Sequence, residues 1–154
     1  MSTDLRAGIH LILVPTKGRV LSDVLEEPLQ RIMEHTILER DGLYHASSLH
    51  GDHLHILFSI AGIEGLHKLI DTLVVDLQQA IAQSEPSLAS FTWEQGVHVT
   101  LLPPWHIEIM ASFVRDQHRY HETHTLDQEL DKVFRPNSVT VDEELDEASA
   151  LCVN

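Results

Sequence analysis

The sequence predicts a single α+β domain of the ferredoxin-like, split βαβ type. Its four strands should form one antiparallel sheet, with two helices on one face and a further helix at the C-terminal end. Two observations predict this class. Apolar patterns follow the order strand, helix, strand, strand, helix, strand, helix, and 154 residues with 43% hydrophobic content suit one domain with a real core.

The first predicted elements are a strand and a helix. Ile9–Val14 is a continuous apolar run that ends at Pro15, which is typical of a buried strand leaving a sheet. Residues 22–40 carry apolar side chains at helical spacing, with Ser22 or Asp23 at the start as a cap and Asp41-Gly42 at the end.

A hairpin and a second helix follow. Two apolar runs, 43–49 and 53–60, flank the turn sequence His50-Gly51-Asp52, which predicts a β-hairpin. Residues 66–81 hold the cleanest helical stripe in the chain. The last predicted elements are extended segments at 91–93 and 97–102, a helix over 106–121 and a short helix over 126–134.

Composition sets the limits of the domain. Residues 1–135 are expected to form it, and residues 136–154 an acidic tail that is disordered or loosely docked. No apolar run reaches the length of a membrane span, and the N-terminus lacks the layout of a signal peptide. Cys152 is the only cysteine, so neither an intramolecular disulfide nor a thiolate metal site is possible. A cytoplasmic protein is the expectation.

The charge of the chain is strongly negative. Ten Lys and Arg stand against 24 Asp and Glu, a formal net charge of −14, and only five of the acids lie in the tail. Affinity for a nucleic-acid backbone comes largely from Lys and Arg, so this balance works against DNA binding. The 12 histidines make the surface charge sensitive to pH near 6.

The sharpest local motif is Asp52-His53-Leu54-His55. On a strand, residues i and i+2 point to the same face, so His53 and His55 project together while Leu54 faces the core. Their Cα atoms lie about 7 Å apart, and the two imidazoles can converge on one divalent ion. Asp52 or a backbone carbonyl could hold the second nitrogen of one ring. A hydrogen-bonded surface pair is the alternative for an isolated motif of this kind.

Four segments, taken together, carry a family resemblance. They are 10–17 (His-Leu-Ile-Leu-Val-Pro-Thr-Lys), 51–58 (Gly-Asp-His-Leu-His-Ile-Leu-Phe), 91–96 (Phe-Thr-Trp-Glu-Gln-Gly) and 113–117 (Phe-Val-Arg-Asp-Gln). In order and spacing they resemble the single-tyrosine transposases of insertion sequences and the related REP-associated tyrosine transposases, which share the HUH motif. Glu94 and Gln95 stand in altered order relative to the family pattern. The resemblance spans residues 8–134.

The resemblance implies a homodimer that cuts and rejoins single-stranded DNA beside hairpins. It implies that His53, His55 and Gln117 hold Mg²⁺ or Mn²⁺, which polarises the scissile phosphate. A tyrosine hydroxyl four residues before the glutamine attacks the phosphorus and leaves a 5′-phosphotyrosine. Because an imidazole–amide site is softer than a pure Mg²⁺ site, Mn²⁺ is the expected tighter ligand.

The chain departs from the family at the nucleophile. Phe113 occupies that position, and a phenyl ring has no oxygen with which to attack phosphorus. The family's Asn before the glutamine is Asp116 here, and the second helix shows Asp71 and Asp76 with Lys68 as its only basic residue. The loss of the hydroxyl and the loss of positive charge both predict a site that no longer cleaves DNA.

Other residues keep competing interpretations open. Tyr120, seven residues beyond Phe113, lies within about 20° of the same helix face and is a substitute nucleophile of low weight. Lys17 and Arg19 form the small basic cluster that could contact DNA. His10 either faces the site or is a core histidine. His118, His121 and His124 are either extra ligands or solvated histidines at a helix end. The aromatic residues Phe91, Trp93 and Trp105 either stack bases or anchor the core or a dimer interface.

Three hypotheses follow, so whether the chain is an enzyme stays open. The first is a degenerate transposase-fold protein, dimeric and metal-binding, without DNA-joining activity. The second is an active transposase or nuclease that uses Tyr120 or a metal-bound water. The third is a non-enzymatic module whose acidic surface meets a basic protein partner.

Overall fold

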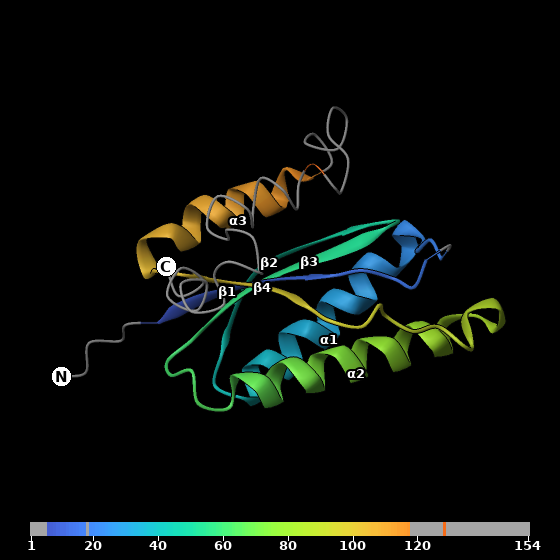
Figure 1. The fold of residues 1–154 in the computed structure, drawn as a ribbon, viewed down its shortest axis with the longest axis horizontal. Helices are drawn as coiled ribbons and strands as arrows, with labels where there is room; N and C mark the ends of the chain where they lie inside the picture. Colours follow the sequence, from blue (N-terminus) through green and yellow to red (C-terminus); the bar gives the residue numbers. More distant parts are fainter. Residues whose placement is uncertain (1–5, 18, 118–127, 129–154) are drawn as a thin grey trace, which may run out of the picture.

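The protein is built on one four-stranded antiparallel sheet with helices on both faces (Figure 1). The computed structural model describes residues 6–17, 19–117 and 128. The strands are β1 (Ala7–Leu13), β2 (Leu43–His50), β3 (His53–Ile60) and β4 (His98–Leu102), in the order β2-β3-β1-β4. The helices are α1 (Glu26–Glu39), α2 (Leu66–Ser84) and α3 (Ile107–Arg115), with short 3-10 turns at Asp23–Leu25, Pro86–Leu88 and Pro104–His106. This order and direction of strands confirm the ferredoxin-like α+β prediction.

The larger core lies between the sheet and the pair formed by α1 and α2, which run side by side beneath it in Figure 1. Alternate residues of β1 and β3 supply the sheet side of this core, and every one of them is apolar. They are Ile9, Leu11 and Leu13 from β1, and Leu54, Ile56, Phe58 and Ile60 from β3. Each such side chain contributes about 1.5–3 kcal/mol when fully buried.

A smaller apolar cluster holds α3 on the opposite face of the sheet. Ile107, Ala111 and Val114 form the buried stripe of this helix and pack on side chains of three strands. Gly8 makes the close approach possible, because a Cβ there would lie only 2.8 Å from Cγ1 of Ile107. The start of α3 is thereby fixed against the beginning of the central strand β1.

One helix boundary differs from the sequence-based prediction, and another cannot be compared because it falls outside the described residues. The segment predicted as one helix from residue 22 begins with a separate 3-10 turn, in which Ser22 Oγ accepts a hydrogen bond from the Val24 amide, and α1 follows from Glu26. The helix predicted over 106–121 is present as α3 over Ile107–Arg115. Asp116 forms a turn and Gln117 is again helical, and residues 118–121 lie outside the described residues. The short helix predicted over 126–134 and the tail 136–154 lie outside the described residues.

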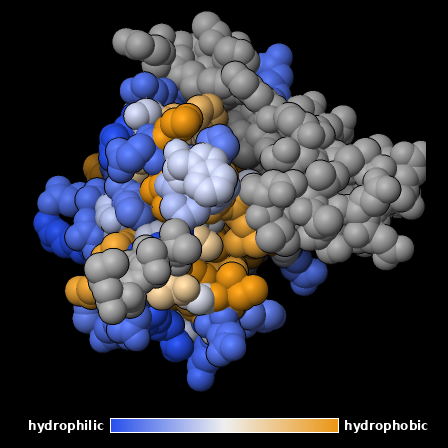
Figure 2. Space-filling model, turned by 90° about the vertical axis from the view of Figure 1, so that its left-hand side faces the viewer, coloured by the Kyte–Doolittle hydropathy of each residue, from blue (hydrophilic) through white to orange (hydrophobic). Residues whose placement is uncertain are grey.

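Exposed apolar side chains gather where the ends of several elements meet. Figure 2 shows apolar atoms among polar ones at the end of the molecule where β1 and α3 begin. The largely exposed apolar side chains of the elements that begin or turn there are Leu43, Ile63, Trp105 and Ile109. Within the described residues, none of the helices combines the length and the apolar character that crossing a membrane requires.

Candidate metal centre

The two histidines of the Asp-His-x-His motif lie together on the α3 face of the sheet. Strand β3 is buried along its whole length, and its alternation sends Leu54 to the α1–α2 core and His53 and His55 to the other side. Both imidazoles are fully buried. Their ring centroids lie 4.9 Å apart at an interplanar angle of 75°. The prediction that the pair projects together is confirmed.

One ring nitrogen of each histidine is held by a neighbour. Nδ1 of His53 lies 2.7 Å from Oδ1 of Asp52, and Nδ1 of His55 lies 2.8 Å from Nε2 of His10. A carboxylate only accepts hydrogen bonds, so Nδ1 of His53 carries the proton and donates it. Nε2 is then the nitrogen of His53 that can coordinate a metal. Of the two partners that the sequence left open, Asp52 or a backbone carbonyl, the structure shows Asp52 bonded to this ring.

His10 faces this site from the neighbouring strand. From the sequence, His10 was either a residue of the site or a core histidine. In the structure its ring is fully buried and is hydrogen-bonded to His55. The β1–β3 register pairs His10 with Leu57, so His55 is its diagonal neighbour on the same face. The two rings are nearly parallel, with an interplanar angle of 8°.

The last turn of α3 brings Phe113 to the pair. The centroid of its half-buried ring lies 6.1 Å from that of His55, and the rings meet edge to face at 88°. Phe113, to which the resemblance assigns the nucleophile's position, therefore contacts one of the two histidines, His55. Tyr120, the substitute considered from the sequence, lies outside the described residues, as do His118, His121 and His124.

Gln117 is also fully buried, just beyond the end of α3. Its side-chain Nε2 donates a hydrogen bond to the Phe113 carbonyl oxygen at 3.2 Å. Among the described residues its Oε1 has no hydrogen-bond partner. A buried amide oxygen left in this state costs about 1–3 kcal/mol, which a bound cation would offset.

The described acidic, thiol and imidazole side chains do not by themselves form a metal site. In the part of the chain that the structure describes, no three His, Cys, Asp or Glu side chains stand together so as to hold a metal. The ligand set that the family resemblance implies, His53, His55 and Gln117, would add one amide oxygen to the two imidazoles. Nitrogen donors with one neutral oxygen suit Mn²⁺ better than Mg²⁺.

More histidines line the same face of the sheet. The His50 ring lies nearly parallel to that of His53, with centroids 5.1 Å apart, and His45 Nε2 lies 2.8 Å from Ser59 Oγ. Burial lowers the pKa of His45 below its ordinary value, although the nearby Glu108 acts in the opposite direction. Sequence reasoning missed His45 and His50. For His50 a signal existed, because a tight turn after it pairs His50 directly with His53.

The predicted basic cluster is divided between two environments. Lys17 is exposed, whereas Arg19 donates to the Ser87 carbonyl oxygen at 3.0 Å and to Ser90 Oγ at 3.1 Å. Arg19 thus ties its own loop to the loop after α2. A role of either side chain in DNA contact stays a prediction.

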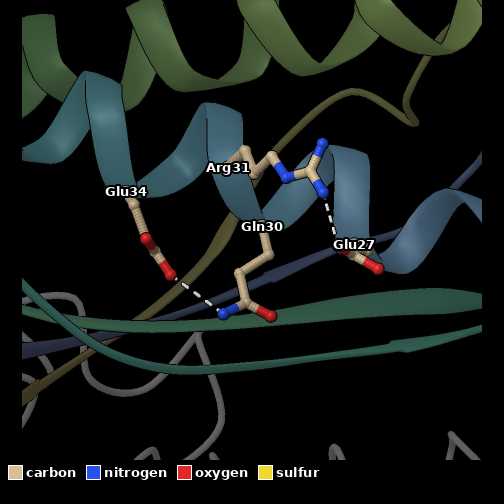
Figure 3. A network of polar contacts seen from close by, with 4 residues as sticks. All are labelled: Glu27, Gln30, Arg31 and Glu34. Atoms are coloured by element: carbon tan, nitrogen blue, oxygen red, sulfur yellow. Dashed lines mark hydrogen bonds and ion pairs between the residues drawn. The ribbon is translucent and has the colours of Figure 1, made fainter.

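Among the described helices, the acidic residues lie mainly in the layer opposite the histidines. Helix α1 contains four acidic residues and one basic residue, whereas α3 contains one of each. Glu27 pairs with Arg31 on the surface of α1, and Gln30 donates to Glu34 at 2.9 Å (Figure 3). Exposed pairs of this kind contribute little, about 0.3–0.5 kcal/mol each. The face with the histidines is the less acidic one among the described elements.

The aromatic residues also separate into two groups. Phe91 and Trp93 are buried and meet at 84° with their centroids 5.0 Å apart, as expected of core anchors. Trp105 is 75% exposed, so it does not anchor the core. Its place in the 3-10 turn before α3 directs it to solvent because the buried stripe of that helix begins only at Ile107.

The comparison with known proteins gives matches among solved structures. The chain matches no protein-family model and no curated protein. Eight chains of solved structures match it. One of them, from Deinococcus radiodurans R1, is described as "a putative transposase"; it is 17% identical, with a TM-score of 0.50, over 78% of this chain and 92% of that one. The two chains share a fold. At this identity the likeness concerns the fold only, and it agrees with the transposase-like architecture predicted from the sequence.

Proposed function

We propose that this chain is a transposase-fold protein that binds a divalent metal ion and has lost tyrosine-dependent DNA cleavage. The ligands are Nε2 of His53, Nε2 of His55 and Oε1 of Gln117. The observation that carries the proposal is the edge-to-face contact between Phe113 and His55, at 6.1 Å between centroids. The side chain in the nucleophile's place reaches the histidines but has no hydroxyl.

In this site, metal binding and DNA cleavage depend on different chemical groups. A bound Mg²⁺ or Mn²⁺ ion would polarise a phosphodiester beside the imidazoles. Covalent transfer of the DNA strand also requires an oxygen nucleophile within reach, which Phe113 does not supply. The protein therefore retains a place for a metal and a phosphate while lacking the group that breaks the P–O bond.

The substrate class follows from the family resemblance and from the charge distribution. Single-stranded hairpin DNA would approach the α3 face, where Asp52, Glu108 and Asp116 are partly balanced by Arg6 and Arg115. The acidic α1 surface lies in the other layer. We infer weak binding of DNA, with a modest salt dependence because few basic side chains are available, and a homodimeric assembly.

A metal titration tests the first half of the proposal. The wild-type chain should bind one Mn²⁺ per protomer in isothermal titration calorimetry, and His53→Ala should weaken this binding by more than about 100-fold, because it removes a ligand. His35→Ala is the matched control, since His35 is exposed on α1 beside Glu39. Failure of the wild-type chain to bind Mn²⁺, or equal binding by His53→Ala, would overturn the metal site.

Restoring the hydroxyl tests the second half. With Mn²⁺ and a pool of single-stranded hairpin DNAs, Phe113→Tyr should form a covalent protein–DNA adduct on a denaturing gel. The wild-type chain and the double variant Phe113→Tyr/His55→Ala should form none. An adduct on the wild-type chain, mapped to Tyr120 by peptide sequencing, would show that the protein is an active enzyme and that the proposal is wrong.

A further inference from the structure

His10 has a place in this site that neither the motif nor the resemblance gives it. The two histidines of the motif are held in the same way, each through Nδ1. For His53 the partner is the adjacent Asp52 at 2.7 Å, and for His55 it is His10, 45 residues away, at 2.8 Å. His10 is fully buried, so water does not compete for this contact.

The direction of the His10–His55 hydrogen bond decides whether His55 can bind a metal. A neutral imidazole carries one proton, and the nitrogen without it is the one that coordinates. If Nδ1 of His55 carries the proton, it donates to Nε2 of His10, and Nε2 of His55 can coordinate. If Nε2 of His10 carries the proton instead, the bond reverses, Nε2 of His55 is protonated, and coordination is blocked.

We propose that His10 is a positioning residue for the metal centre: its Nε2 accepts the Nδ1 proton of His55 and so presents Nε2 of His55 to the ion. Asp52 does the same for His53 with a carboxylate. The inference rests on the proposed metal-binding function for its consequence, but the hydrogen bond itself can be tested without metal. The nearly parallel rings, at 8°, keep the donor and acceptor nitrogens directed at each other.

The sheet supplies the rigidity that this role needs. His10 and His55 lie on adjacent central strands, so neither backbone can move without breaking the β1–β3 ladder. Asp52, in contrast, sits at the hairpin turn with its side chain 64% exposed. We therefore expect His10 to orient its ligand more firmly than Asp52 orients His53.

The first test reads the protonated nitrogen of His55 directly. Long-range ¹H–¹⁵N correlation spectra of metal-free protein with ¹⁵N-labelled histidine should show His55 with its proton on Nδ1, its signals being assigned by their loss in His55→Gln. In His10→Leu the proton should move to Nε2. In His10→Gln, whose amide oxygen can still accept, it should stay on Nδ1. A wild-type His55 protonated at Nε2 would overturn the proposal, whether or not the protein binds metal.

The second test measures how much His10 contributes to Mn²⁺ affinity. His10→Leu should weaken Mn²⁺ binding by about 10–100-fold, as loss of a group that orients a ligand does, and His10→Gln should restore it to within about threefold of wild type. His45→Leu is the matched control, because that histidine shares the face but bonds Ser59. Thermal unfolding of metal-free samples checks that the two His10 variants are folded. Equal Mn²⁺ affinity of folded His10→Leu and wild type would overturn the positioning role.

The two tests also separate this inference from the proposed function. A His55 proton on Nδ1 that depends on residue 10, in a chain that binds no Mn²⁺, would support the positioning and contradict the metal site. Mn²⁺ binding that is lost in His53→Ala but kept in His10→Leu would support the metal site and contradict the positioning.

Discussion

The two faces of the sheet are built from the same strands and are both buried, yet they differ in chemistry. Toward α1 and α2, β1 and β3 present apolar side chains without exception. Toward α3, the same strands present His10, His53, His55 and Ser59 beside apolar neighbours, and all four are buried. A buried polar group costs free energy unless it finds a partner, so the second face is a poorer core than the first.

This difference teaches where stability and function reside. A chain that needed only to fold could have used apolar residues on both faces, as it does on one. Departures of this kind from a consistent core are expected at functional sites. The α1–α2 face should therefore govern the stability of the fold, and the α3 face should tolerate substitutions that remove function without removing structure.

The largest expected change in the free energy of unfolding comes from a substitution on the apolar face. Phe58→Ala removes a fully buried ring from the larger core, and the free energy of unfolding should fall by about 3–5 kcal/mol. Urea denaturation followed by circular dichroism measures it, with Phe58→Leu as a control that should lose less. A loss below about 1 kcal/mol would show that this face is not closely packed and would remove the contrast between the faces.

A smaller change in the free energy of unfolding, of opposite sign, is expected from a substitution of Gln117. Gln117→Leu removes a buried amide whose Oε1 has no hydrogen-bond partner among the described residues, so the metal-free protein should gain about 1 kcal/mol. Gln78→Leu on α2 is the matched control, because Gln78 Oε1 accepts from the Trp93 amide at 3.4 Å and its loss should not stabilise. Denaturation curves of both variants decide the point, and a destabilised Gln117→Leu would mean that the amide serves the fold.

The smallest effect is a pH dependence contributed by His45. Because burial lowers its pKa in the folded state, the unfolded chain binds more protons between the folded value and the ordinary value of 6.5. This contribution to stability is present above pH 6.5 and is lost as the pH falls through that window. Comparing wild type with His45→Gln by denaturation from pH 5 to 8 should show a shallower decline in the variant. An unchanged slope would mean that His45 titrates alike in both states.

Much of the fold could be predicted from local patterns. The strand over 53–60 and the helix from residue 66 appear as expected, because strict alternation and a long helical stripe are unambiguous signals. The end of α3 was less certain, since helix ends depend on local capping more than on periodicity. Trp105 shows another limit, because composition says how many aromatics a chain has and not which of them the packing leaves exposed.

The sequence by itself determined that His53 and His55 share a face, because the side-chain period of a strand is two whatever the strand pairs with. It also determined that position 113 lacks a hydroxyl. Only the tertiary structure decided that His10 bonds His55, since that contact depends on the register by which β1 pairs with β3. It likewise decided that Phe113 meets His55, since packing of α3 on Gly8 and its neighbours sets the position of that helix. Local periodicity fixes the direction of a side chain, whereas contact between distant segments depends on how the whole core packs.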